Sequence, residues 1–131
     1  MILFETLKNY AIRCNDRKDY ATATTVYNQR LVAGWVYKTG LAAVTMTAAV
    51  TFPFEFDSVP IVIVSSCGAR STASGAPTDQ GDFDSSANIH VICRNVTTFG
   101  FNVRWYSADG STNFSTSFNY GASYLVIGTK S

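Results

Sequence analysis

Charged residues are scarce in this chain of 131 residues, of which Asp, Glu, Lys and Arg make up 15%, against roughly 25% in an average domain. The net charge is +1 and no basic tract occurs, so a surface that follows a nucleic-acid backbone is not expected. A surface with so few charges must consist of Ser, Thr, Asn and Gly, or be partly hidden between copies of the chain.

Long hydrophobic runs are also missing. No apolar stretch approaches the roughly 20 residues that span a bilayer, so we expect no membrane insertion. Residues 1–5 lack a basic segment and a cleavage site, and a secretory signal is therefore not expected.

Cysteine and histidine are few. The three cysteines, Cys14, Cys67 and Cys93, are odd in number and far apart, which argues for reduced thiols and folding in a cytosol. No CxxC pair occurs, and the single histidine, His90, has no Cys or His neighbour with which to hold zinc. We therefore expect no metal centre and no cofactor.

The acidic residues are scattered, which argues against an enzyme. Asp79, Asp82 and Asp84 do lie close together, but without the Gly turn and final Glu of a calcium loop. A solvated acidic loop is the favoured interpretation, and a site for a hard cation is the alternative. Neither a GxSxG turn, nor a Gly-rich phosphate loop, nor a carboxylate pair placed for glycoside hydrolysis is recognisable. The sequence favours recognition over catalysis.

The strongest positive pattern is the alternation over residues 42–56, in which every even position is apolar. Such alternation is typical of a β-strand with one buried face. Ser58-Val59-Pro60 ends the run, and residues 61–64 begin a strand that we expect to be more fully buried. The other expected strands are 30–37, 61–67, 88–95, 99–106, 114–120 and 122–128. The count predicts an all-β fold, an antiparallel β-sandwich of six or seven strands.

Residues 1–29 differ from the rest. Leu3, Leu7, Tyr10 and Cys14 recur at helical spacing, but the stripe does not continue far. Two interpretations stay open: a short helix packed on its own domain, or the end of a stalk where copies of the chain meet. We expect a helical or irregular N-terminal segment over residues 1–29 and a β-sandwich domain over 30–131.

Candidate binding residues lie in polar loops and at strand ends. Residues 68–86 form a long expected loop with Phe83 as its single large apolar anchor. Aromatic rings can stack on sugars, and Asn, Asp, Ser and Arg can bind their hydroxyls. Strand alternation groups Trp105 with Phe99, Phe101 and Val103, which favours burial of Trp105, and places Tyr106 opposite. Asp109 in the turn at 107–113 adds a candidate carboxylate.

Three short motifs follow one another along the chain. Residues 50–64, VTFPFEFDSVPIVIV, contain the form V-x-F-P-x-x-F-x-x-x-P-x-V, and residues 96–103, VTTFGFNV, have the form V-T-x-x-G-F-x-V. Residues 124–128, YLVIG, are close to W-x-A-I-G, with Tyr124 and Val126 in place of Trp and Ala. In this order the motifs resemble those of phage tail-fibre tip domains, which are similar in turn to H-type lectins.

The resemblance implies a homotrimer in the virion, at the distal end of a tail fibre or tailspike, that binds host-surface polysaccharide or protein. In H-type lectins an Arg after the third strand and an aromatic pair after the G-F-x-V strand touch the sugar, and the matching positions here are Arg70 and Trp105-Tyr106. A twist or bulge at the strand end would reconcile this role of Trp105 with the alternation. The candidate ligand contacts are thus Arg70, Trp105, Tyr106 and Asp109.

A trimer would also explain the low content of charged residues. Thr45, Thr47 and Ala49, on the second face of the strand at 42–56, are small and uncharged, and we expect them to contact a neighbouring subunit. Two other functions stay open: a structural trimerisation or capping domain of a fibre, and a free-standing H-type-like lectin.

Overall fold

The computed structural model of the chain describes residues 28–84 and 89–131. The N-terminal segment predicted over residues 1–29, with both interpretations of its helical stripe, therefore lies almost wholly outside the described residues. Cys14 lies outside them as well.

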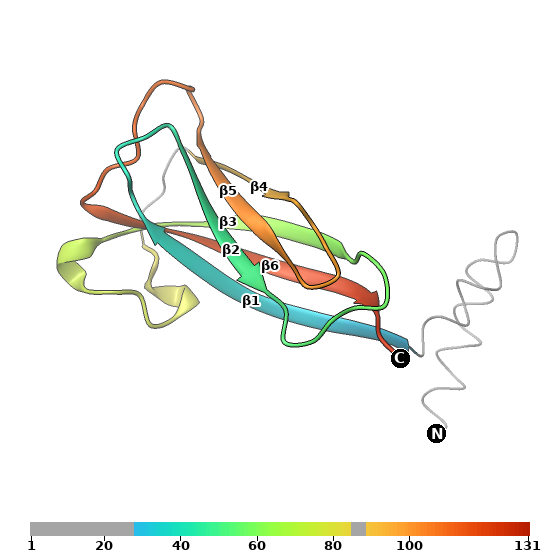
Figure 1. Ribbon diagram of the computed structural model, residues 1–131. Helices are drawn as coiled ribbons and strands as arrows, with labels where there is room; N and C mark the ends of the chain where they lie inside the picture. The colour runs from blue at the N-terminus through green and yellow to red at the C-terminus, as the bar shows by residue number, and fades with distance from the viewer. Residues whose placement is uncertain (1–27, 85–88) are drawn as a thin grey trace, which may run out of the picture.

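Six strands form two antiparallel three-stranded sheets that pack face to face (Figure 1). One sheet has the order β1-β6-β3 and the other β2-β5-β4. The strands are β1 (Gln29–Thr39), β2 (Thr45–Thr51), β3 (Ile61–Ser71), β4 (Ile89–Arg94), β5 (Gly100–Ser107) and β6 (Phe118–Thr129). The predicted all-β, antiparallel sandwich is confirmed, and the described helical structure consists of the short 3-10 turns Thr72–Ser74 and Gln80–Asp82.

The core lies between the two sheets and follows the predicted alternation. Along β5, Phe101, Val103 and Trp105 are buried, and across the core Val126 of β6 is 0% exposed. Phe101 also meets the ring of Tyr124 edge to face, with 5.3 Å between centroids. Tyr124 thus fills the place of the Trp in the related motif as a core aromatic.

The strand predicted over residues 42–56 is shorter in the structure, because β2 ends at Thr51. Burial nevertheless continues at alternate positions, with Phe52 at 6% and Phe56 at 1% exposure. Their rings meet edge to face at 5.2 Å, and Phe52 N donates to Phe99 O at 2.7 Å. The alternation in residues 52–56 therefore arises because an irregular segment after β2 inserts its aromatic rings into the end of the core.

Two predicted strands, 114–120 and 122–128, are in fact the single strand β6, preceded by a turn. β3, which lies beside β6 at the edge of the same sheet, is longer than predicted and continues to Ser71 through a bulge between Ser66 and Gly68. The first residues of the predicted loop at 68–86 therefore belong to a strand.

The expectation that residues 61–64 are more fully buried is wrong. Val62 and Val64 pack against the core, but Ile61 is 65% exposed and Ile63 is 54% exposed. The reason is that β3 belongs to a sheet whose outer face is left open along this stretch by the described residues.

The loops are divided unequally between the two ends of the sandwich (Figure 1). The connections β1–β2, β3–β4 and β5–β6 gather at one end, where Gly40 N donates to Phe118 O at 3.0 Å and Ala42 N to Phe114 O at 2.9 Å. The connections β2–β3 and β4–β5 lie at the opposite end. There the start of β1 meets the C-terminus, since Lys130 N donates to Asn28 O at 2.8 Å.

Candidate functional site

The loop that follows β3 folds back over the outer face of β1-β6-β3. Phe83 anchors it, as the sequence composition indicated: its ring meets Trp35 edge to face at 6.0 Å and lies flat over Gly121 of β6. A Cβ at position 121 would come within 2.5 Å of the ring, so the loop can dock here only on a glycine. The loop is therefore held to the sheet at its far end.

Arg70, a predicted ligand contact, lies near the end of β3 and is tied to this same loop. Its Nη1 is 2.8 Å from Asp82 Oδ2, and its Nη2 donates to Ser74 O at 2.6 Å. Asp82 also accepts from the backbone and hydroxyl of Thr78, and these bonds, the backbone bond first, lower the pKa of its carboxyl. Arg70 thus orders the loop through two internal contacts.

Local hydrogen bonds engage two of the three acids in this loop, Asp79 and Asp82. Asp79 accepts from Gly81 N at 3.0 Å, and Asp82 accepts from Asp79 N at 3.0 Å, which forms a capping box around the turn Gln80–Asp82. Within residues 28–84 and 89–131, no three His, Cys, Asp or Glu side chains are grouped as a metal site.

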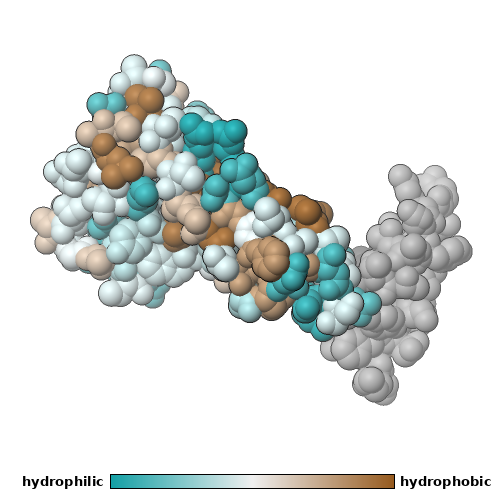
Figure 2. All heavy atoms as spheres, in the orientation of Figure 1, coloured by the Kyte–Doolittle hydropathy of each residue, from teal (hydrophilic) through white to brown (hydrophobic). Residues whose placement is uncertain are grey.

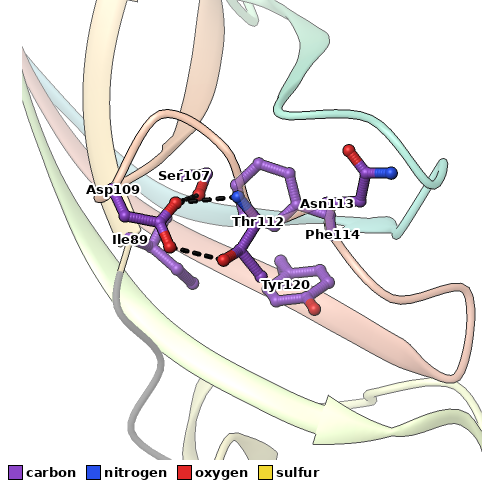
Figure 3. Close-up of a pocket in the computed structure, with 7 residues that line it drawn as sticks. All are labelled: Ile89, Ser107, Asp109, Thr112, Asn113, Phe114 and Tyr120. Carbon is purple, nitrogen blue, oxygen red and sulfur yellow. Dashed lines mark hydrogen bonds between the residues drawn. The ribbon is translucent and has the colours of Figure 1, made fainter.

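Asp109, a second predicted contact, closes the β5–β6 loop from within (Figure 3). Its Oδ1 accepts from Ser107 Oγ at 2.7 Å, Ser111 N at 2.9 Å and Thr112 N at 2.8 Å. Its Oδ2 accepts from the hydroxyl of Thr112. These bonds, led by those from Thr112, hold the pKa of Asp109 far below its usual range. The carboxylate is therefore ionised and largely occupied by its own loop.

A cavity of about 270 Å³ lies beside this loop, between the two sheets at the loop end. Asp109 and Thr112 form its polar side, and the rings of Phe114 and Tyr120 form its apolar side (Figure 3). The two rings meet edge to face at 4.8 Å, and Tyr120 Oη accepts from Ser115 N at 3.0 Å. Ile89, Ser107 and Asn113 complete the lining.

Trp105 and Tyr106, the remaining predicted contacts, point to opposite sides of β5. Trp105 is 0% exposed and donates from Nε1 to Gly121 O at 3.3 Å, so its ring belongs to the core. β5 pairs with β2 and β4 in regular register up to Tyr106, without the bulge that could have exposed Trp105. Tyr106 lies half-buried on the outer face, with the guanidinium carbon of Arg104 4.9 Å from its ring centre.

The outer face of β2-β5-β4, which we call the arginine face, is polar. The strand register gives it three rows, in which a residue of β5 lies between one of β2 and one of β4. The rows are Thr45–Tyr106–His90, Thr47–Arg104–Ile92 and Ala49–Asn102–Arg94. No acidic residue belongs to these rows.

An open hollow of about 230 Å³ adjoins the arginine face where β4 turns into β5. Phe99, which alternation had grouped with the core residues of β5, lies in this turn and is 61% exposed. Asn95 and Asn102 also line the hollow. Sequence reasoning missed Phe99 and Arg104 as site residues, although Arg104 shares strand parity with Tyr106.

The outer face of β1-β6-β3, which we call the apolar face, has a contrasting character. Its rows are Leu31–Ile127–Ile61, Ala33–Leu125–Ile63 and Trp35–Ser123–Ser65, the last of which borders the docked loop where Trp35 meets Phe83. None of these side chains is charged, and Leu31 is 66% exposed. Figure 2 shows one side of the molecule, on which strongly hydrophilic residues are confined to a few clusters. The end that carries the connections β1–β2, β3–β4 and β5–β6 is mostly pale, which marks residues of intermediate hydropathy.

Comparison with solved structures finds this fold in phage proteins. The tailspike protein gp49 of Pseudomonas phage LKA1 aligns with a TM-score of 0.57 and 22% identity, over 79% of this chain and 15% of that chain. The tailspike gp61 of Pseudomonas phage phi297 aligns with a TM-score of 0.54 and 21% identity, over 76% and 15%. The resemblance to phage fibre proteins is confirmed for the fold.

Discoidin II of Dictyostelium discoideum shares the fold as well, with a TM-score of 0.52 and 20% identity over 79% of this chain and 38% of that chain. No family model and no curated protein matches the sequence. This chain matches only a minor part of each of these three proteins, and at such identities the likeness establishes the architecture.

No helix among the described residues is long and apolar enough to cross a membrane.

Proposed function

We propose that this chain is the receptor-binding domain of a phage tail fibre or tailspike, and that it binds host-surface glycan as a homotrimer at the distal end of the fibre. The observation that carries the proposal is the fold shared with segments of two phage tailspikes. The ordered motifs at residues 50–64, 96–103 and 124–128 support it independently.

The placement of the loops suits a distal position. The start of β1 and the C-terminus lie at one end of the sandwich, and the connections β1–β2, β3–β4 and β5–β6 lie at the other (Figure 1). A stem joined before Asn28 would therefore carry the loop end outward. Loops held on a rigid sandwich are a common way to present binding residues.

The apolar face is the surface that we propose for contact between subunits. Three rows without a charge are suited to the centre of an interface, where charged residues are depleted. Thr45, Thr47 and Ala49, the contact expected from the sequence, share their rows with Arg104 and Arg94. Copies that met there would bring like charges together, so the apolar face suits a threefold contact better.

The proposed activity is binding without catalysis. Among the described residues, the carboxylates of Asp79, Asp82 and Asp109 accept hydrogen bonds within their own loops, and Glu55 and Asp57 accept from Thr98 and Ser131, which argues against a free carboxylate pair for glycoside hydrolysis. Three sites on one trimer, and several fibres on one virion, would raise the avidity of weak sugar contacts by orders of magnitude.

The test is binding of the full chain to host cells with and without their surface polysaccharide, read by flow cytometry. We expect binding that the polysaccharide supports and that soluble polysaccharide inhibits. A folded, trimeric protein that binds neither cells nor isolated glycans would overturn the proposal.

One second function has a specific observation in its favour. The polar groups of Arg70 and Asp109 form hydrogen bonds within their own loops and hold these loops in place. Such internal bonds suit a structural capping domain, which needs ordered loops and no ligand. If capping is the whole function, deletion of residues 72–84 leaves cell binding of the parent fibre intact. Loss of binding from a still-trimeric fibre would exclude this second function.

A further inference from the structure

We infer that the arginine face, together with the hollow beside Phe99, binds an acidic saccharide, whose carboxylates contact Arg104 and Arg94. The inference rests on the proposed function and names its ligand class. It assigns binding to a sheet face. Of the residues carried over from related lectins, Tyr106 belongs to this face, whereas Trp105 is buried in the core and Arg70 is tied to the loop that follows β3.

Arg104 is the main residue of this site, because its guanidinium has no hydrogen-bond or ion-pair partner among the described residues. Its Nε is buried without an acceptor. Its Cζ lies 4.9 Å from the ring centre of Tyr106, so that the aromatic ring supports the guanidinium plane. A supported, unpaired guanidinium is suited to the bidentate recognition of a carboxylate.

The surroundings of Arg104 are basic. Arg94 and His90 lie on β4 in the rows on either side of Arg104, at diagonal positions that are roughly 7–8 Å apart in an antiparallel sheet. Neither forms an ion pair with a described acid. Glu55, which accepts from Thr98 in the β4–β5 turn at 3.1 Å, is not among the residues that line the hollow. The face is thus complementary to an anion.

The hollow provides what a sugar ring needs beside its carboxylate. The ring of Phe99, 61% exposed, offers a face for the apolar side of a pyranose. Asn95 and Asn102 offer amide donors and acceptors for hydroxyls. Asn102 also pairs in register with Arg94, which joins the hollow to the cationic rows. These contacts together select a saccharide over a simple anion.

The experiment measures binding of the full chain to three carboxylated polysaccharides, namely alginate, hyaluronate and polysialate, with neutral dextran and with dextran sulfate for comparison. The variants are Arg104→Gln and Phe99→Ala. The control is Arg30→Gln, which removes the same charge from the exposed start of β1. Circular dichroism and thermal unfolding verify that each variant is folded.

We expect at least one carboxylated polysaccharide to bind and dextran not to bind. Arg104→Gln should weaken that binding about tenfold or more, and Arg30→Gln should change it less than about twofold. Phe99→Ala should weaken binding of the carboxylated polysaccharide, because it removes the ring that contacts the sugar. Any binding of dextran sulfate through its charges alone should stay unchanged.

Three results would overturn the inference: equal binding of dextran, equal losses for Arg104→Gln and Arg30→Gln, or no binding of any carboxylated polysaccharide by a protein that still binds host cells. In the last case the proposed function stands, but the receptor is not an acidic saccharide bound at the arginine face. Absence of cell binding as well would contradict the proposed function itself.

Discussion

The ring of Phe56 packs against the backbone of Gly128, where a Cβ would come within 2.6 Å of Phe56 Cδ1. These residues belong to the first and third of the ordered motifs. Phe52 of the first motif lies 5.9 Å, centre to centre, from Phe101 of the second. The three motifs therefore meet in one aromatic cluster that closes the sandwich at the end opposite the long loops.

Gly128→Ala should destabilise the domain by about 1–3 kcal/mol, because the new methyl group would displace the Phe56 ring from a packed cluster. Chemical denaturation measures this difference. Gly81→Ala is the matched control, since its Cβ would have Asp79 Oδ1 at 3.9 Å as its nearest neighbour, and it should change stability by less than about 0.5 kcal/mol. Equal effects of the two substitutions would contradict this role of Gly128.

Phe83→Ala should release the loop that follows β3. The substitution removes the edge-to-face contact with Trp35 and the cover over Gly121, and we expect a loss of about 1–3 kcal/mol. Limited proteolysis should show faster cleavage within residues 72–84, and Trp35 fluorescence should shift to the red. Unchanged cleavage would show that Arg70 and Asp82 hold the loop without the ring.

The β5–β6 loop should lose order in acid. The pKa of Asp109 is lower in the folded state than in the unfolded chain, so its contribution is present above the unfolded value, about 4, and is lost as the pH falls below it. Amide exchange at Ser111 and Thr112 measures the loss. Asp109→Asn should exchange fast at all pH values, whereas Asp84→Asn, whose side chain accepts no hydrogen bond from a described residue, should behave as the original protein does.

Ile63→Glu should convert the proposed trimer into monomers, because it places a charge at the centre of the apolar face. Light scattering should give about three times the chain mass of 14.2 kDa before the substitution and the chain mass after it. Leu41→Glu is the control: Leu41 is 57% exposed in the β1–β2 loop, away from this face. A trimer that survives Ile63→Glu would place the contact elsewhere.

Much of the fold could be predicted from alternation, and the errors have physical causes. Alternation identified the side chains that face the core from Met46 through Phe56, although the backbone leaves the sheet after Thr51, but it wrongly grouped the exposed Phe99 with the core. The two strands predicted around Gly121 are one strand, because Gly121 pairs in register with both Tyr37 and Gly68. Its lack of a side chain makes room for Phe83, which comes from a loop far away in the sequence. Such a contact between distant segments leaves no local pattern.

The candidate site was less predictable. Alternation correctly favoured burial of Trp105, against the role carried over from related lectins. The internal role of Asp109 had a local signal, since the run Asp109-Gly110-Ser111-Thr112 is typical of a turn closed by an aspartate side chain. The arginine face could not be found in this way, because the strand pairing that brings Arg94 beside Arg104 depends on the fold.

The most direct test of the central claim is a glycan array of bacterial surface polysaccharides, probed with the full chain and with Arg104→Gln. The account predicts that the protein binds a subset of these glycans and that the substitution weakens this binding. A folded protein that binds none of the glycans and does not bind host cells would contradict the claim that this domain recognises a receptor.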